Sequence, residues 1–531
     1  MSGSLQAALR GYSAFLRSAE GRPALLGLLG AVLATVGSFG AGAVRVHDTQ
    51  LEATHLSWLR FGHGLVLSSV LFWAGIALLM IAWIRFGRAA LAGRAEARQV
   101  AGTVALWIVP LLVAVPLYSR DAYSYLAQGA LLRDGYDPYV DGPVMNPNGL
   151  LDDVSGIWTT TTAPYGPLFI LIARVVTGVL GDNVLAGVIA LRLVMLPGIA
   201  LSVWGVAKLA RHFGTQPAVS LWLAVLNPLV IVHLVGGVHN EALMVGLMVA
   251  GIALVLDRRH LIGVAVIVTA VAVKGTAAIA LPFVVWIWYH HRRRDRPDEG
   301  VARSYGAAIG ASIALFVGLF AAFSLIAGVG LGWTTALAGS IKIINYITLP
   351  TAIAQLFAFA AAPFTDLHLA PILIVTRALG IAALAITLVA LWWRFRQDER
   401  RNVMGILLGL LAVCVLSRVA ALVLHLAAGR GRGVHLVAAH TGDHRRPLGV
   451  AHGGVHAHGV DRALLAVERG PGGRAGRPGR LVAAAPGPAA GAAEARPGTR
   501  GVDTSCASRR RRDSRHGDGV SSNLLCGFGM P

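Results

Sequence analysis

One group of residues has the types and spacing for proton-transfer chemistry at a membrane surface. Asp121 follows an apolar run, residues 100–118, and its near neighbours are Arg120, Tyr123 and Tyr125. An ionised carboxylate at the hydrocarbon boundary is costly to desolvate, so it needs a partner such as Arg120 or a function. A carboxylate so placed can take a proton from a hydroxyl group. We therefore predict that Asp121 is catalytic.

A second polar group interrupts a later apolar run. Asn227-Pro228 breaks the run, which continues to Gly236-Gly237 and is followed by His239, Asn240 and Glu241. Proline removes a backbone hydrogen bond, and the freed groups need protein or water partners at membrane depth. We predict that His239, Asn240 and Glu241, which end this span, contact the substrate.

Two further cations, Lys274 and Lys342, are candidates for contact with an anion. Lys274 lies inside an apolar stretch, where contact with a phosphate and a structural ion pair are both open interpretations. Lys342, in the later segment 331–369, is a weaker phosphate candidate. Arg192 is expected to be structural.

The composition indicates the class of protein that must position these residues. Of 531 residues, 55% are hydrophobic and only 14% are charged, which is too apolar for an ordinary soluble domain. Apolar runs of roughly 18 to 25 residues recur, long enough for helices to cross a bilayer. We predict an all-α, polytopic integral membrane protein.

The apolar runs predict about eleven spans, and their basic flanks predict the orientation. The spans are 24–44, 64–84, 100–118, 186–207, 218–235, 240–256, 261–273, 275–289, 304–330, 370–392 and 402–424. Short loops rich in Arg and Lys stay in the cytoplasm. The basic gaps are 10–22, 85–98, 208–211, 258–259, 292–303 and 394–401. We expect all of them, and the N-terminus 1–23, to be cytoplasmic.

Keeping every basic gap inside requires two unusual segments. Residues 167–180 are too few for a typical transmembrane span. If they did cross the membrane, the basic gap 208–211 would lie on the extracytoplasmic side, so we expect a re-entrant or juxtamembrane helix instead. Residues 261–289 must start and finish inside, so Lys274-Gly275 is the expected outward turn of two short helices.

These choices place three loops on the outer side of the membrane. They are residues 119–185, 236–241 and 331–369, which include all the candidates above except Lys274 and Arg192. Most aspartates of the first loop are expected to be solvated. Because the loops share a side, they can build one extracytoplasmic site.

The order of several short motifs resembles that of a known enzyme family. The motifs are Ser119-Arg120-Asp121-Ala122-Tyr123-Ser124-Tyr125, Gly135-Tyr136-Asp137-Pro138-Tyr139, Pro164-Tyr165-Gly166-Pro167, Asn227-Pro228, Gly236-Gly237-Val238-His239-Asn240-Glu241 and Val273-Lys274-Gly275. Together they resemble the GT-C glycosyltransferases, above all the actinobacterial polyprenyl-phosphomannose-dependent α-(1→6)-mannopyranosyltransferases. The resemblance covers about residues 20 to 417.

The resemblance implies a GT-C-type helical bundle over 24–417, with its catalytic loop at 119–185. It implies transfer of mannose from a polyprenyl-phosphate donor to a lipid-anchored mannan, with inversion, at the outer face of the cell membrane. The essential aspartate of the family's first outer loop matches Asp121, which would deprotonate the acceptor. Lys274, Arg120 and His239 would offset the charge of the departing phosphate. Tyr123, Tyr125 and Tyr165 would stack on sugars or sit as interfacial aromatics.

Asp121 and Glu241 are the carboxylates that could share a divalent metal. The sequence holds no tight cluster of metal ligands, however, so no cofactor is expected. Two other functions stay open at this point, a transporter or flippase for a lipid-linked sugar and a non-catalytic membrane assembly subunit. No inverted repeat of the kind found in many transporters is visible. Donor lipid, mannan acceptor and membrane lipids are the expected partners.

The tail 418–531 has an anomalous composition. It holds 17 Arg, no Lys and 7 acidic residues, so its net charge of +10 is half of the chain's +20. Arg, Ala and Gly without Lys are typical of GC-rich DNA read in a wrong frame. We predict that 418–531 is a frameshift product, and that its basic charge indicates no nucleic-acid partner.

Overall fold

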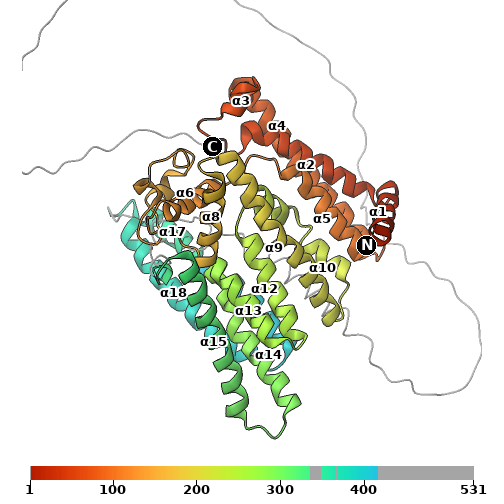
Figure 1. Ribbon diagram of the computed structural model, residues 1–531, viewed down its shortest axis with the longest axis vertical. Coiled ribbons are helices and arrows are strands. Elements are labelled where there is room, and N and C mark those ends of the chain that lie inside the picture. Colours follow the sequence, from red (N-terminus) through yellow and green to blue (C-terminus); the bar gives the residue numbers. More distant parts are fainter. Residues whose placement is uncertain (1, 335–347, 366–368, 417–531) are drawn as a thin grey trace, which may run out of the picture. The chain divides into compact units, whose positions relative to one another are not determined.

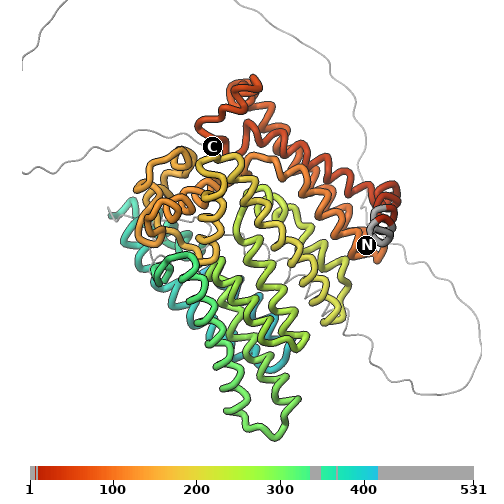
Figure 2. The backbone as a smooth tube through the Cα atoms, viewed as in Figure 1, coloured from red at the N-terminus to blue at the C-terminus, as the bar shows by residue number. Residues whose placement is uncertain are grey.

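The computed structural model describes residues 2–334, 348–365 and 369–416 (Figures 1 and 2). Within these ranges the regular elements are all helices, which confirms the predicted all-α class. The tail 418–531 and Lys342 lie outside the described residues.

Five described helices are long and apolar enough to cross a membrane. They are α2 (Arg22–Ala41), α4 (Gly62–Leu91), α9 (Val184–His212), α15 (Val301–Ala327) and α18 (Leu369–Arg394). Each corresponds to a predicted span. A sixth candidate is the pair formed by α10 (Pro217–Ala224) and the segment Pro228–Gly236, which meet at a bend of 49°. The predicted break at Asn227-Pro228 is therefore confirmed.

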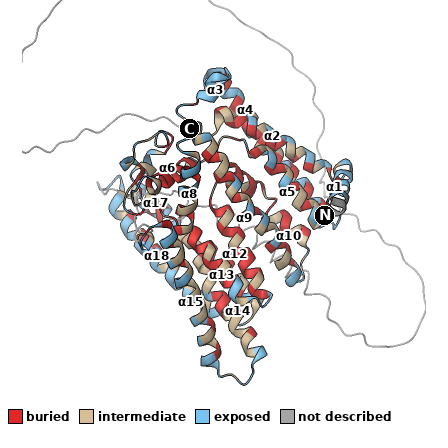
Figure 3. Cartoon of the chain, viewed as in Figure 1, coloured by how far each residue is buried: buried red, intermediate tan, exposed pale blue. Residues whose placement is uncertain are grey.

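The remaining predicted spans are shorter helices or helices with polar ends. They are α5 (Ala97–Leu111), α12 (Glu241–Leu256), α13 (His260–Val273), α14 (Ala280–Asp295) and α19 (Glu399–Leu416). At 1.5 Å per residue the 14 residues of α13 extend about 21 Å, less than the hydrocarbon thickness. Among these five helices α12 is the most completely buried (Figure 3), whereas α13 exposes Leu261 and Ile262 near its start.

The crossing of α9 and α12 positions the start of α12, which carries Glu241. Gly198 and Gly246 face each other at this crossing, and a Cβ on Gly246 would overlap the backbone of Gly198. Small residues let two membrane helices approach to backbone contact. The close approach brings α12 against α9, so the depth of Glu241 is set by the packing of these two helices.

The prediction that Asp121 lies at the end of a membrane helix was wrong. The helix α5 contains Pro110 in its last turn and ends at Leu111, and residues 112–120 are not helical. Pro116 cannot donate a backbone hydrogen bond, which is consistent with this break. Asp121 instead begins a new helix, α6 (Asp121–Arg133).

The first part of the predicted solvated loop is also part of the core. Every residue of α6 from Ala122 to Leu131 is buried, because the helix packs against α8 (Pro167–Leu180) and α9. The short helix predicted for 167–180 is confirmed, with Pro167 at its first position. Likewise α13 ends at Val273, and a 3₁₀ turn over Gly275–Ile279 leads into α14, as predicted for Lys274-Gly275.

Candidate functional site

Asp121 is placed by the start of α6. It is the first residue of this helix, and its backbone N–H donates to Ser119 Oγ over 3.1 Å. A helix N-terminus carries partial positive charge, which favours a carboxylate there. Tyr118, three residues earlier, has a φ of +61°, a conformation that is costly for a bulky residue. The turn into α6 therefore holds a strained backbone directly beside the candidate base.

His239 is placed by a second strained turn, between the π-helical turn η3 (Ile231–Gly236) and α12. Val238 is fully buried with a φ of +58°, which is unusual for a β-branched residue. Gly237 is needed because a Cβ there would lie 2.6 Å from His233 O and 2.8 Å from His239 Cδ2. This packing directs the imidazole toward Asp121, and His239 Nδ1 lies 3.3 Å from Asp121 Oδ2.

Two more charged residues extend this contact into a row. The other carboxylate, Glu241, has its Oε2 3.9 Å from His239 Nδ1. Lys274 Nζ donates to Glu241 Oε1 over 2.5 Å and lies 5.6 Å from the ring centroid of Tyr165. We call Asp121, His239, Glu241 and Lys274 the charge row. Negative and positive side chains alternate along it, so each buried charge has an opposite neighbour.

The structural ion pair weighed for Lys274 is therefore present. It does not exclude contact with a phosphate, because the ammonium group has three donors and its side chain keeps 18% of its surface exposed. Gly166 N donates to Val273 O over 3.2 Å, which holds Tyr165 against the end of α13. The predicted site residues from three distant segments thus meet.

The ionisation of the first two members of the charge row is coupled. Burial opposes the charged form of each group, but the interaction between them outweighs it. The pKa of Asp121 lies below its ordinary value because of His239 and, further away, Lys274. The pKa of His239 lies above its ordinary value because of Asp121 and Glu241. Asp121 is therefore ionised and His239 favours the imidazolium form.

Arg192 connects the two strained segments and is structural, as predicted. Its guanidinium is 1% exposed and donates to four backbone carbonyl oxygens at 2.7 to 3.1 Å. Two acceptors, Leu112 and Ala114, follow the end of α5; the other two, Val235 and Gly236, lie in η3. The side chain therefore joins the segment leading to Asp121 with the one leading to His239.

Arg120 is not the partner of Asp121, which corrects the prediction. Its guanidinium donates to Asp153 O over 2.9 Å and to Val44 O over 2.7 Å. The guanidinium carbon of Arg120 lies 5.8 Å from the ring centroid of Tyr123. The Tyr123 hydroxyl donates to Ala43 O over 2.6 Å. Both side chains anchor the loop after α2, because its carbonyls lack helical partners. They contact no member of the charge row through an observed hydrogen bond.

Tyr125 and Asn240 lie beside the charge row with unpaired polar atoms. The ring of Tyr125 packs edge-on against that of Tyr165, with centroids 5.2 Å apart. Both residues are fully buried, and the Tyr125 hydroxyl and Asn240 amide have no hydrogen-bond partner among the described residues. Ser124 and Gln128, which we did not predict, share this property on α6. Ser124 and Gln128 are four residues apart and so share one face of α6, and this spacing is the sequence feature that could have identified them.

The described residues hold no group of three or more His, Cys, Asp and Glu side chains suited to a metal ion. Asp121 and Glu241, the pair considered for a shared ion, lie on either side of the His239 imidazole. The site as it stands offers a carboxylate base, two cations and uncommitted hydrogen-bonding groups.

Comparisons with known proteins identify the family of the chain. Residues 24–290 match the family described as α-(1→6)-mannopyranosyltransferase, N-terminal domain, and residues 350–421 match the MptB C-terminal domain. The chain belongs to the α-(1→6)-mannopyranosyltransferase family. It is therefore an enzyme, a glycosyltransferase, which favours this function over the transporter and the silent subunit.

Curated relatives cover most of the described part of the chain. α-(1→6)-Mannopyranosyltransferase A of Mycobacterium tuberculosis is 54% identical over 399 residues, 75% of this chain and 77% of the relative. The protein of the same name from Corynebacterium glutamicum is 40% identical over 388 residues, 70% of this chain and 79% of the relative. α-(1→6)-Mannopyranosyltransferase B of the same organism is 32% identical over 404 residues, which is 69% of this chain and 65% of the relative. No solved structure matches the chain significantly.

The coupled titration predicts a pH window for the stability that His239 contributes. The lowered pKa of Asp121 adds stability above its unfolded value, about 3.9, which is lost as the pH falls through the folded pKa. The raised pKa of His239 adds stability below its unfolded value, about 6.5, which is lost as the pH rises through the folded pKa. The ion pair should therefore stabilise most between about pH 4 and 6.5.

Melting temperatures of the purified wild type and His239→Gln, measured across this range and up to pH 9, test the window. The difference between them should shrink as the pH rises through the folded pKa of His239. His63→Gln, at an exposed position of α4, is the matched control substitution. A His239→Gln difference that stays constant from pH 5 to 9 would contradict the coupling.

Proposed function

We propose that this enzyme transfers mannose from a polyprenyl-phosphate donor to a hydroxyl group of a lipid-anchored mannan, forming an α-(1→6) bond. The observation that carries the proposal is the charge row, which offers a carboxylate at one end and a cation at the other. The sugar and the linkage are those for which the relatives are named.

The reaction is a single displacement. Asp121 takes the proton of the acceptor 6-hydroxyl while that oxygen bonds to the anomeric carbon. The bond from this carbon to the phosphate oxygen breaks, and its electron pair leaves with the polyprenyl phosphate on the opposite face. The configuration therefore inverts, from a β-linked donor to an α-linked product, and no covalent enzyme intermediate is required.

Each other member of the charge row has a part in this scheme. Lys274, held by Glu241, would offset the charge that develops on the leaving phosphate. His239 would keep Asp121 ionised and oriented until the acceptor arrives, because its imidazole contacts that carboxylate. This scheme draws only on the protein's own side chains.

The unpaired polar atoms favour a substrate rich in hydroxyl groups. Ser124 Oγ, Tyr125 Oη, both polar atoms of the Gln128 amide and both of the Asn240 amide are buried without a partner among the described residues. A buried polar atom without a hydrogen bond costs about 1 to 3 kcal/mol. Hydroxyl groups of a sugar bound beside α6 would pair with them and recover this cost. Tyr125 and Tyr165 offer ring edges and faces next to the same atoms.

The substitution Asp121→Asn should leave the protein in the membrane and lower mannosyl transfer by about 10²- to 10⁴-fold, the range expected for loss of general-base catalysis. Membrane vesicles given radiolabelled polyprenyl-phosphomannose and a short α-mannoside would measure the transfer. Asp152→Asn, an exposed carboxylate of the same segment, is the control and should keep full activity. More than a tenth of wild-type activity in Asp121→Asn would remove Asp121 as the base.

The role of Lys274 can be separated from its ion pair with Glu241. If Lys274 contacts the donor phosphate, Lys274→Ala should raise the apparent KM for the donor lipid more than that for the acceptor. The double variant Glu241→Gln/Lys274→Ala should keep this defect, because the lost phosphate contact is not restored. If the defect disappears when Glu241 is also neutralised, Lys274 serves only to balance that carboxylate.

We place the reaction on the outer face of the cell membrane. Two exposed positions test this orientation by labelling with a membrane-impermeant maleimide in intact cells: Val140, in the segment after α6, and Asp298, between α14 and α15. With the native Cys414, Cys506 and Cys526 replaced by Ser, Val140→Cys should be labelled and Asp298→Cys should not. The reverse pattern would overturn the orientation.

A further inference from the structure

A cavity of about 500 Å³ lies apart from the charge row. Tyr123 forms part of its wall, whereas Asp121 and the other members of the charge row do not. Residues two apart on a helix point about 200° apart, so Tyr123 and Asp121 leave α6 on nearly opposite sides. The cavity is therefore separated from the charge row by the first turn of α6.

The walls of this cavity are mostly apolar. They come from α2, the segment between α2 and α4, the segment after α5 and the start of α9. Four of the lining side chains, Val36, Leu56, Val113 and Leu185, are 37% to 59% exposed. Because α2 and α9 are both candidate membrane spans, an apolar opening between them faces the hydrocarbon of the bilayer. A chain of methylene groups can enter there and be buried.

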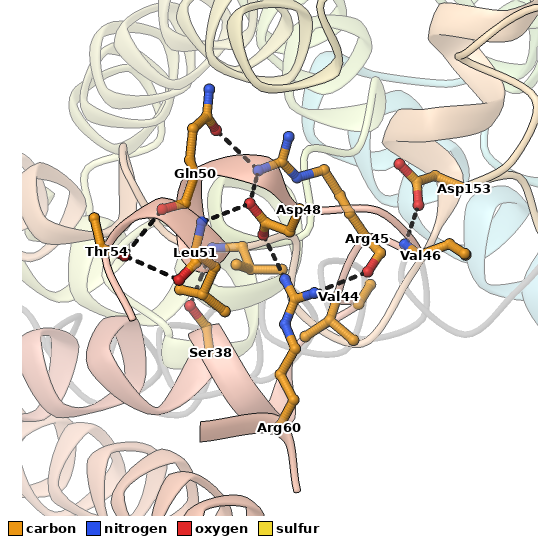
Figure 4. Close-up of polar contacts among 12 residues, drawn as sticks. Ser38, Val44, Arg45, Val46, Asp48, Gln50, Leu51, Thr54, Arg60 and Asp153 are labelled. Carbon is orange, nitrogen blue, oxygen red and sulfur yellow. Dashed lines mark hydrogen bonds and ion pairs between the residues drawn. The ribbon is translucent and has the colours of Figure 1, made fainter. Parts of the chain in front are cut away.

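One end of the cavity is polar and is lined by Arg45, Asp48 and Gln50. Asp48 there is paired with both Arg45 and Arg60, and Arg45 Nη2 also donates to Gln50 Oε1 over 2.9 Å (Figure 4). Two guanidinium groups thus share one carboxylate. Helix α3 (Thr49–Ala53) starts at this carboxylate, which accepts from Leu51 N over 3.1 Å.

A further uncompensated cation lies in the apolar wall. Arg192 lines the cavity, and the acceptors recorded for it are all backbone carbonyls, with no carboxylate among the described residues. Among the residues that line the cavity, Arg45 and Arg192 outnumber the single carboxylate of Asp48, so the lining carries a net positive charge. The planar guanidinium of Arg45 matches the geometry of a phosphate.

We propose that this cavity binds one anionic phospholipid of the surrounding bilayer, at a site separate from the reaction. An acyl chain would fill the apolar part, and the phosphate would meet Arg45. The sugar donor fits this cavity poorly, since its phosphate must adjoin the sugar carbon that the acceptor attacks, and that carbon belongs beside Asp121. The lipid is therefore a bound component that is not consumed.

The cavity wall is tied to the strained segments of the site. Tyr123 and Arg120 donate to the carbonyls of Ala43 and Val44, which precede Arg45. Arg192 donates to carbonyls of the segment after α5 and of η3. A lipid that orders residues 43–48 would order these contacts as well. It should raise the melting temperature of the protein, since ligands that bind only the folded state stabilise it.

Native mass spectrometry of the purified full chain, reconstituted with phosphatidylglycerol or phosphatidylcholine, tests the proposal. The wild type should retain a single phosphatidylglycerol and should melt at a higher temperature in that lipid. Val188→Trp fills the cavity from α9 and should lower retention about tenfold. Leu193→Trp, on the same helix but 50% exposed and outside the cavity lining, is the matched control and should retain it.

Arg45→Gln should abolish the preference for phosphatidylglycerol over phosphatidylcholine without filling the cavity, so the proposal stays testable if Val188→Trp fails to fold. Equal retention of both lipids by the wild type, or full retention in Val188→Trp, would overturn it. Displacement of the lipid by farnesyl phosphate would also overturn it, because that result would assign the cavity to the isoprenoid donor. Loss of transfer in Asp121→Asn has no bearing on this measurement, so the two proposals fail independently.

Discussion

The buried guanidinium of Arg192 is the interaction on which the site depends. In a bilayer, every backbone carbonyl that leaves a helix must find another donor. The end of α5 and the π-helical turn η3 both free carbonyl groups at the same depth, and Arg192 donates to two from each. It thereby makes two helix breaks tolerable and fixes their distance. The strained residues Tyr118 and Val238 lie just beyond these breaks.

The breaks are what allow ionisable groups to gather inside an apolar bundle. An unbroken pair of helices would place Asp121 and His239 on separate spans, and their loops would meet only in solvent. Here the first residue of α6 and the turn before α12 meet within 3.3 Å. Alternation of sign from Asp121 to Lys274 keeps the charge row close to neutral, which limits the cost of burying it. A row of this kind can accept a proton at one end and face an anion at the other.

The two sides of α6 have different surroundings. Its first turn presents Asp121 to His239 on one side and Tyr123 to the loop after α2 on the other. The polar groups of Ser124, Tyr125 and Gln128 stay unpaired inside the bundle. Helix α6 therefore separates the reacting groups from the apolar cavity, and Arg120 and Tyr123 bind its start to the loop after α2.

The class of the protein, its five long spans, the Asn227-Pro228 break and the short helices around Lys274-Gly275 follow from the sequence, because hydrocarbon thickness and helix rise allow few alternatives. The grouping of Asp121, His239, Glu241 and Lys274 also follows from the sequence, since the positive-inside rule puts their loops on one side. The residue that partners Asp121 could not be predicted from the sequence. Arg120 turns instead to carbonyls 33 and 76 residues away, and only tertiary packing decides which distant backbone atoms lack a donor. The burial of α6 was hidden for the same reason: a helix with so many polar residues becomes core only when α8 and α9 enclose it.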